Sequence, residues 1–100
     1  MPRLNYDKQH SRGFHLSFSN GWTVSVQFGR YNYCENKNYR NDNEQPSLEC
    51  PDAEIAAVHE SGKWFKFEGD EDNDTSVKGY VSDGDVAKFI YKVSQLKGVK

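Results

Sequence analysis

The side chains that could hold a metal ion or act as a nucleophile are few in this chain. Cys34 and Cys50 bracket a long polar segment, and His10, His15 and His59 are the three histidines. A zinc site needs about four ligands, and no histidine stands at a recognisable spacing from the cysteines. We therefore expect no metal ligands. Free thiols and a disulfide both stay open, with free thiols favoured because no export signal is present and a reducing cytosol keeps cysteines unpaired.

A second group of reactive types is acidic. Asp70, Asp72 and Asp74 have the alternating spacing that opens a calcium-binding loop. Such a loop carries glycine at its sixth position and glutamate at its twelfth, whereas this chain has Thr75 and Val81 there. A solvated turn fits the pattern better. The three aspartates could also imitate phosphates in a basic groove of a partner, so we treat them as candidate partner-binding residues.

The third group lies in the segment Gly29–Asp52, where five asparagines, two prolines and few aliphatic residues predict a long loop. Aromatic rings can stack on bases while arginines hold phosphates. The residues of these types are Arg30, Tyr31, Tyr33, Tyr39 and Arg40. Neighbouring carboxylates would repel a nucleic-acid backbone. We therefore interpret the five residues as a surface for a protein partner, with single-stranded nucleic acid as the alternative.

A catalytic set is missing from the sequence. The glycines show no spacing that cradles a phosphate, and no hydrolase or kinase motif is present. His59 lies in a predicted strand and fits a hydrogen-bonded strand histidine better than a general base. A Cys/His nucleophile pair would lack an oxyanion or orienting motif. We expect a protein that is not an enzyme and has no cofactor; a small-molecule or metal binder at Cys34, Cys50 and His59 is a further alternative.

The first expected secondary structure in the chain is a β-hairpin. Apolar residues alternate with polar ones from Phe14 to Phe18 and again from Trp22 to Phe28, which predicts two half-buried strands. A two-residue Asn20-Gly21 turn would place the two apolar rows on opposite faces of the sheet. A three-residue turn over 19–21 pairs Phe18 with Trp22 and puts both rows on one face, with a glycine where positive φ is needed. We predict the three-residue turn.

The second half of the chain predicts further strands and one helix. The ranges 53–59 and 64–67 form a second expected hairpin, although the first could also begin a helix, and 76–81 is an expected fifth strand. Ser82 with Asp85 resembles a helix N-terminal capping box, and Gly98 could cap the C-terminus. Between them an apolar stripe recurs at helical spacing. It consists of Val86, Phe89, Ile90, Val93 and Leu96.

These elements predict an α+β fold, in which an antiparallel sheet of four to five strands has one C-terminal helix packed on one face. One hundred residues allow a single hydrophobic core, so we expect one domain over 14–98 preceded by 1–13 as a mobile basic arm or short edge segment. No apolar stretch is long enough to span a membrane. The range 35–85 carries fourteen acidic and five basic residues, and the remainder one acidic and eight basic. The overall charge of −2 therefore conceals an asymmetry that can guide partner choice.

Four short blocks carry a resemblance to a known group of proteins. SNGWTVSVQFG (19–29), NYC (32–34), AEIAA (53–57) and GYVSDGDVAKFI (79–90) resemble segments of small uncharacterised proteins encoded by bacteriophages. These proteins have no assigned activity, so the resemblance implies no functional residues. It implies a setting, the cytoplasm of an infected bacterium. There we expect a non-catalytic protein that binds a host or phage protein. Inhibition of a host defence or nucleic-acid-handling machine is one form that this binding can take.

Overall fold

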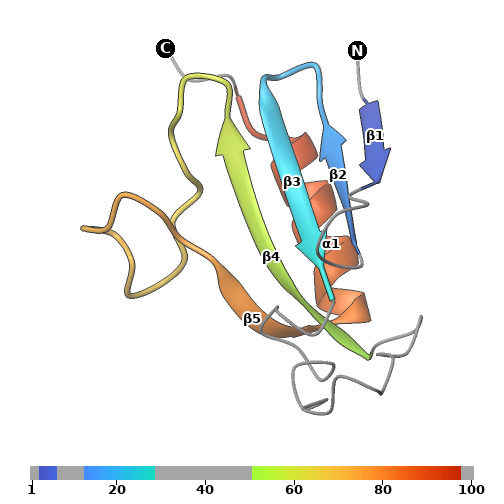
Figure 1. The fold of residues 1–100 in the computed structure, drawn as a ribbon. Coiled ribbons are helices and arrows are strands. Elements are labelled where there is room, and N and C mark those ends of the chain that lie inside the picture. Colours follow the sequence, from blue (N-terminus) through green and yellow to red (C-terminus); the bar gives the residue numbers. More distant parts are fainter. Residues whose placement is uncertain (1–2, 7–12, 29–50, 98–100) are drawn as a thin grey trace.

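The computed structural model describes residues 3–6, 13–28 and 51–97. Five strands pair in the order β1-β2-β3-β4-β5, each antiparallel to the next along the chain. A single helix follows and lies behind the sheet in the view of Figure 1. The elements are β1 (Arg3–Tyr6), β2 (Gly13–Ser17), β3 (Trp22–Gln27), β4 (Asp52–His59), β5 (Lys78–Ser82) and α1 (Asp83–Ser94). The predicted α+β fold, with an antiparallel sheet and one C-terminal helix, is confirmed.

The first residues of the chain contribute to the sheet. Strand β1 pairs with β2, so that Leu4 lies opposite Leu16 and Tyr6 opposite Phe14. Of the two alternatives for 1–13, a mobile arm or an edge segment, the edge segment applies to Arg3–Tyr6. Gly13 already belongs to β2, one residue before the expected start of the domain.

The predicted register of the β2–β3 hairpin is confirmed. Phe14 lies opposite Val26 and Leu16 opposite Val24, and the Phe18 N–H donates to the Trp22 carbonyl at 2.8 Å. The three-residue turn therefore puts the apolar rows of both strands on one face. The β3 row is buried, and Phe14 and Phe18 pack against it.

The turn needs glycine at position 21 for two reasons. Gly21 has φ of +92°, a conformation that side chains with a Cβ rarely adopt. A Cβ at this position would also lie 2.6 Å from Nε2 of His59. The Gly21 carbonyl accepts a hydrogen bond from the Glu60 N–H at 2.8 Å. The turn is thereby fastened to the chain that follows β4.

Helix α1 covers the face on which the apolar rows gather. Ser82 caps its N-terminus by accepting from the Asp85 N–H at 3.3 Å, as the capping pattern predicted. Phe89 and Val93 are buried, and the rest of the predicted stripe packs around them. The helix contacts β3, β4 and β5. The core is therefore a single layer between α1 and the sheet, built mainly from β3, β4 and two turns of α1.

The side chain of Asn20 joins the hairpin to the end of α1. Its Nδ2 donates to the carbonyls of Val93 and Leu96, each at 2.9 Å, while its Oδ1 accepts from the Trp22 N–H at 3.0 Å. The last carbonyls of a helix have no partner within the helix. One amide group thus completes the hairpin turn and satisfies carbonyls at the C-terminus of the helix.

Several predicted elements differ from the structure in their bounds, and one is missing. The strand expected over 64–67 is wrong, because only Trp64 pairs, in a single bridge to Val58. Beyond it the chain leaves the sheet, and Phe65 and Phe67 pack against Phe89 of α1. The edge of β4 is then taken by β5, which runs over 78–82 and not over the expected 76–81.

The helix also ends earlier than predicted. Its last residue is Ser94, and Gln95 forms the C-cap with its N–H directed to the carbonyls of Lys92 and Val93. Gly98, which the sequence favoured as the cap, lies outside the described residues. The helix stops where the Asn20 side chain takes over the role of capping group.

Removal of the Asn20 amide should weaken the whole fold. We expect Asn20→Ala to lower the free energy of unfolding by about 2 kcal/mol, because two hydrogen bonds worth roughly 1 kcal/mol each are lost. Asn20→Asp should cost at least as much, since a carboxylate would face the negative end of the helix dipole. Urea denaturation measures both, with Ser19→Ala in the exposed neighbouring position as the control. Equal stability of Asn20→Ala and the control would contradict this role.

Candidate functional site

The face of the sheet opposite α1 is not covered by any helix of the described residues. Two rows of side chains cross it in register. One row runs from His15 through Ser25 to Ala56, and the next runs through Ser17, Thr23, Val58 and Trp64. These residues line a hollow of about 480 Å³ together with Glu54, Ile55 and Val77. We name this hollow and its lining the outer face.

The half of the outer face on β2 and β3 is polar and internally bonded. The hydroxyls of Ser17 and Thr23 lie 2.8 Å apart and share a hydrogen bond. The Ser25 hydroxyl accepts from Nε2 of Gln27 at 3.3 Å. These contacts hold the hydroxyl groups in place, so this half presents a fixed polar surface.

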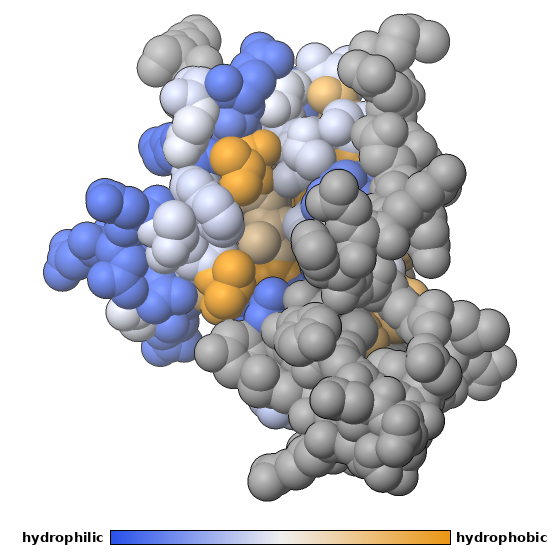
Figure 2. Space-filling model, viewed as in Figure 1, coloured by the Kyte–Doolittle hydropathy of each residue, from blue (hydrophilic) through white to orange (hydrophobic). Residues whose placement is uncertain are grey.

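The other half, on β4 and beyond, is apolar except for Glu54. Ala56, Val58, Trp64 and Val77 lie here, and Val77 is 42% exposed. Figure 2 shows this side of the molecule, where hydrophobic atoms form a patch near the middle of the face. Exposed apolar side chains grouped in one place mark interaction sites more often than scattered ones do. This half of the outer face is suited to an apolar ligand or partner.

Next to the outer face, β5 carries a β-bulge with a backbone outlier. Ala53 pairs with Val81 and Ile55 with Lys78, so Gly79 and Tyr80 both lie opposite the single residue between them on β4. Tyr80 has φ of +55°, and its side chain is 54% exposed. An aromatic residue at positive φ is strained, and such strain is often kept where function requires it. The sequence contains no signal for this conformation.

The geometry of the outer face does not assemble a nucleophile with a base. Among the described residues, His15 forms no hydrogen bond to the hydroxyls of Ser17, Thr23 or Ser25. Those hydroxyls bond to each other or to Gln27 instead. A nucleophile is activated when a base lies within hydrogen-bonding distance. The arrangement therefore suits binding, and the expectation that the protein is not an enzyme stays a prediction.

His59 has a structural role in the core. Its side chain is buried and stacks edge-on against Trp22, with ring centroids 5.3 Å apart. Its Nδ1 accepts from the Ser61 N–H at 3.1 Å. This agrees with the interpretation of a hydrogen-bonded strand histidine. Within the described ranges no group of three or more metal-ligating side chains comes together.

The three aspartates of the acidic loop after Phe67 differ in their contacts. Asp70 accepts hydrogen bonds from Asn73 Nδ2 at 3.0 Å and from Ser76 Oγ at 2.8 Å. Ser76 is buried and in turn accepts from the Phe67 N–H at 2.9 Å. Lys66 Nζ donates to the Asn73 carbonyl, closing the loop. Asp70 is thus an organiser of the loop, while Asp72 and Asp74 are exposed to solvent.

The remaining sequence-predicted site residues lie outside the described part of the chain. These are Arg30, Tyr31, Tyr33, Tyr39 and Arg40, together with Cys34 and Cys50. The interpretation of that segment as a partner surface stays a prediction, as does the thiol state. The residues that the sequence analysis missed are those of the outer face. The alternation of apolar and polar residues predicts two faces for each strand, but it indicates a role only for the apolar face, which forms the core.

Comparison of the chain with known proteins found no matching family model, no similar curated protein and no similar solved structure. The resemblance to bacteriophage proteins therefore stays a prediction. No helix in the described residues has the length and apolar character needed to cross a membrane.

The two roles within the acidic loop can be separated by mutation. Asp70→Ala removes the acceptor of a buried hydroxyl, and we expect the free energy of unfolding to fall by about 1.5 kcal/mol. Asp72→Ala changes an exposed side chain and should stay within about 0.5 kcal/mol of the parent protein. Chemical denaturation of both variants provides the comparison. Equal stability of the two variants would contradict the role of Asp70 in stabilising the loop.

The strain at Tyr80 predicts an unusual order of stability. Glycine adopts positive φ freely, whereas alanine does not, so Tyr80→Gly should be more stable than Tyr80→Ala by about 1 kcal/mol. At an ordinary strand position the order is the reverse, as a comparison of Thr23→Gly with Thr23→Ala should show. Thermal unfolding of the four variants tests this. A Tyr80→Ala protein as stable as Tyr80→Gly would contradict the strained conformation.

Proposed function

We propose that this protein is a non-catalytic interaction protein that binds a host or phage protein through the outer face. The observation that carries the proposal is the hollowed side of the sheet that no described helix covers, with mainly apolar residues on one half and fixed hydroxyls on the other. Of the described residues that line it, only His15 and Glu54 are ionisable. The centres of protein interfaces are similarly poor in charge and rich in aromatic residues.

The chemistry of the outer face favours a particular kind of partner surface. Val58, Trp64 and Val77 can bury apolar side chains, and the hydroxyls of β2 and β3 can bond to polar groups beside them. An amphipathic helix of the partner offers both along one line. On the other side of the sheet α1 already packs in this manner, so a partner helix would complete a three-layer arrangement.

The outer face supports a protein partner better than a nucleic acid. None of the described residues that line the hollow is a lysine or arginine, whereas phosphate contacts supply most of the affinity in nucleic-acid binding. The alternative of a single-stranded nucleic-acid binder depends on the segment between Arg30 and Arg40, outside the described residues. The alternative of a small-molecule or metal binder at Cys34, Cys50 and His59 is weakened, because the His59 side chain is packed and hydrogen-bonded in the core. Inhibition of a host defence or nucleic-acid-handling machine stays a prediction from the bacteriophage resemblance.

A matched pair of variants tests the outer face. Val77→Asp places a charge in the apolar half of the hollow, and Tyr91→Asp makes a similar change at an exposed position of α1. Proteins captured from a bacterial lysate by the parent chain should be compared with those captured by each variant. We expect a partner whose affinity, measured after purification, falls roughly tenfold or more with Val77→Asp because an unpaired charge enters the interface. Tyr91→Asp should leave it unchanged.

Two results would overturn the proposal. One is capture that Val77→Asp and Tyr91→Asp affect equally, which would place the interface elsewhere. The other is the absence of any specific protein partner together with tight binding of a single-stranded oligonucleotide that weakens steeply with salt. Circular dichroism of both variants checks that neither has lost the fold.

A further inference from the structure

A second hollow lies on the opposite side of the sheet, where the core is open between β5, α1 and the chain that leaves β4. It has a volume of about 260 Å³. Its inner wall is apolar, and three lysines and one aspartate surround the opening. The lining residues are Ile55, Phe65, Phe67, Lys78, Val81, Asp85, Lys88, Phe89 and Lys92. We name it the lysine-rimmed hollow.

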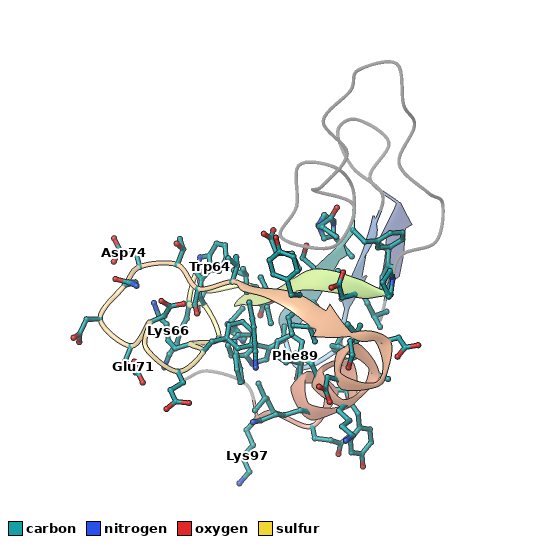
Figure 3. All side chains as sticks on the ribbon, turned by 90° about the horizontal axis from the view of Figure 1, so that it is seen from below. Trp64, Lys66, Glu71, Asp74, Phe89 and Lys97 are labelled. Atoms are coloured by element: carbon teal, nitrogen blue, oxygen red, sulfur yellow. The ribbon has the colours of Figure 1, made fainter. Side chains whose placement is uncertain are left out.

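The floor of this hollow is a fixed aromatic cluster. The ring centroids of Phe65, Phe67 and Phe89 lie 5.2 to 5.3 Å from one another. Phe89 is buried, and the other two rings are half-buried. In Figure 3, Phe89 extends from α1 towards the sheet. Because each ring is held by the other two, the floor offers a preformed apolar surface to a side chain that enters the hollow.

The rim carries positive charge that the described residues do not neutralise. Lys78 and Lys92 form no ion pair with any described residue, and Lys92 Nζ lies 5.4 Å from the centroid of the Phe65 ring. Lys88 lies 3.9 Å from Asp85, but both side chains are mostly exposed, where an ion pair contributes little. Lys88 and Lys92 stand four residues apart on α1, an arrangement of like charges that costs helix stability. Three cations therefore face one carboxylate around an apolar floor.

We propose that the lysine-rimmed hollow binds an acidic protein segment that inserts one large apolar side chain between its carboxylates. The complementarity is of two kinds, since carboxylates match the three lysines and the inserted side chain contacts the phenylalanine floor. The hollow is smaller than the roughly 300 to 1,000 Å³ of typical small-molecule sites, so it fits a single side chain better than a cofactor. This site opens on the other side of the sheet from the outer face, although Ile55 lines both hollows, and it adds to the function proposed for that face.

Two other occupants are less well matched. A single-stranded nucleic acid would need ring faces on which its bases could stack, whereas the rings of this floor pack against one another. A second copy of this chain could offer its own acidic loop, in which Glu71 and Asp74 lie on the outer side away from Phe89 (Figure 3). That loop has no large apolar residue between Glu68 and Ser76, so it lacks the side chain that the floor would receive.

The test uses the full-length chain and a synthetic peptide in which four glutamates surround one tryptophan. Fluorescence polarisation of the labelled peptide measures the affinity. Two control peptides replace either the tryptophan with alanine or the glutamates with glutamine, and we expect each to bind at least tenfold more weakly. The double variant Lys88→Gln/Lys92→Gln should also lose roughly tenfold in affinity. The matched double variant Lys63→Gln/Lys97→Gln, which changes two exposed lysines outside the hollow, should not.

The position of the bound peptide is determined from changes in the protein's nuclear magnetic resonance chemical shifts when the same peptide is added. We expect the largest changes at Phe65, Phe67 and Phe89, and the same binding by Val77→Asp, which separates this site from the outer face. The proposal is overturned by equal binding of the alanine-containing peptide, by equal losses in the two double variants, or by shifts confined to the outer face. It is also overturned if an oligothymidine displaces the peptide at lower concentration, or if the chain dimerises through these lysines.

Discussion

The side-chain amide of Asn20 connects the two parts of this fold. Its oxygen fixes the three-residue turn that sets the register of β2 against β3, and its nitrogen holds the carbonyls at the end of α1. With that register, the apolar rows of both strands face the helix, and the polar rows face the other way. A different turn would exchange the faces of one strand. The separation of apolar and polar rows on β2 and β3 therefore depends on a turn that one asparagine stabilises.

The two surfaces have opposite character because they arise from different features of the sheet. The outer face is the side that no described helix covers, and its lining is nearly uncharged. The lysine-rimmed hollow exists because Phe65 and Phe67 leave the sheet to pack against Phe89, which opens a gap between α1 and the edge of β4. A protein of this size can thus offer a neutral surface and a cationic one on opposite sides of a single sheet.

The polar residues of greatest chemical interest in the sequence serve the structure instead. His59 packs on Trp22 at the end of the hairpin, and Asp70 ties Ser76 into the acidic loop. Each satisfies hydrogen-bonding groups that would be costly to bury alone. Conversely, the groups that gather at the two hollows are common residue types whose positions in the sequence are far apart, such as Ser17 and Trp64, or Phe65 and Lys92.

Local periodicity and turn chemistry are sufficient to predict several elements of this fold from the amino-acid sequence. The alternation over 14–28 predicted two strands and their register, because only one turn length places all the large apolar residues together. The capping pattern at Ser82 and the helical stripe predicted the helix and its buried face. The same reasoning gives the wrong result at 64–67 and at the helix end, because both depend on contacts between residues distant in the chain. Phe65 and Phe67 pack against Phe89 instead of continuing a strand, and Asn20 donates hydrogen bonds to carbonyls more than 70 positions away. The two hollows and the strained Tyr80 have no signal in the sequence, because each results from which strands become neighbours and where the ladder between β4 and β5 shifts.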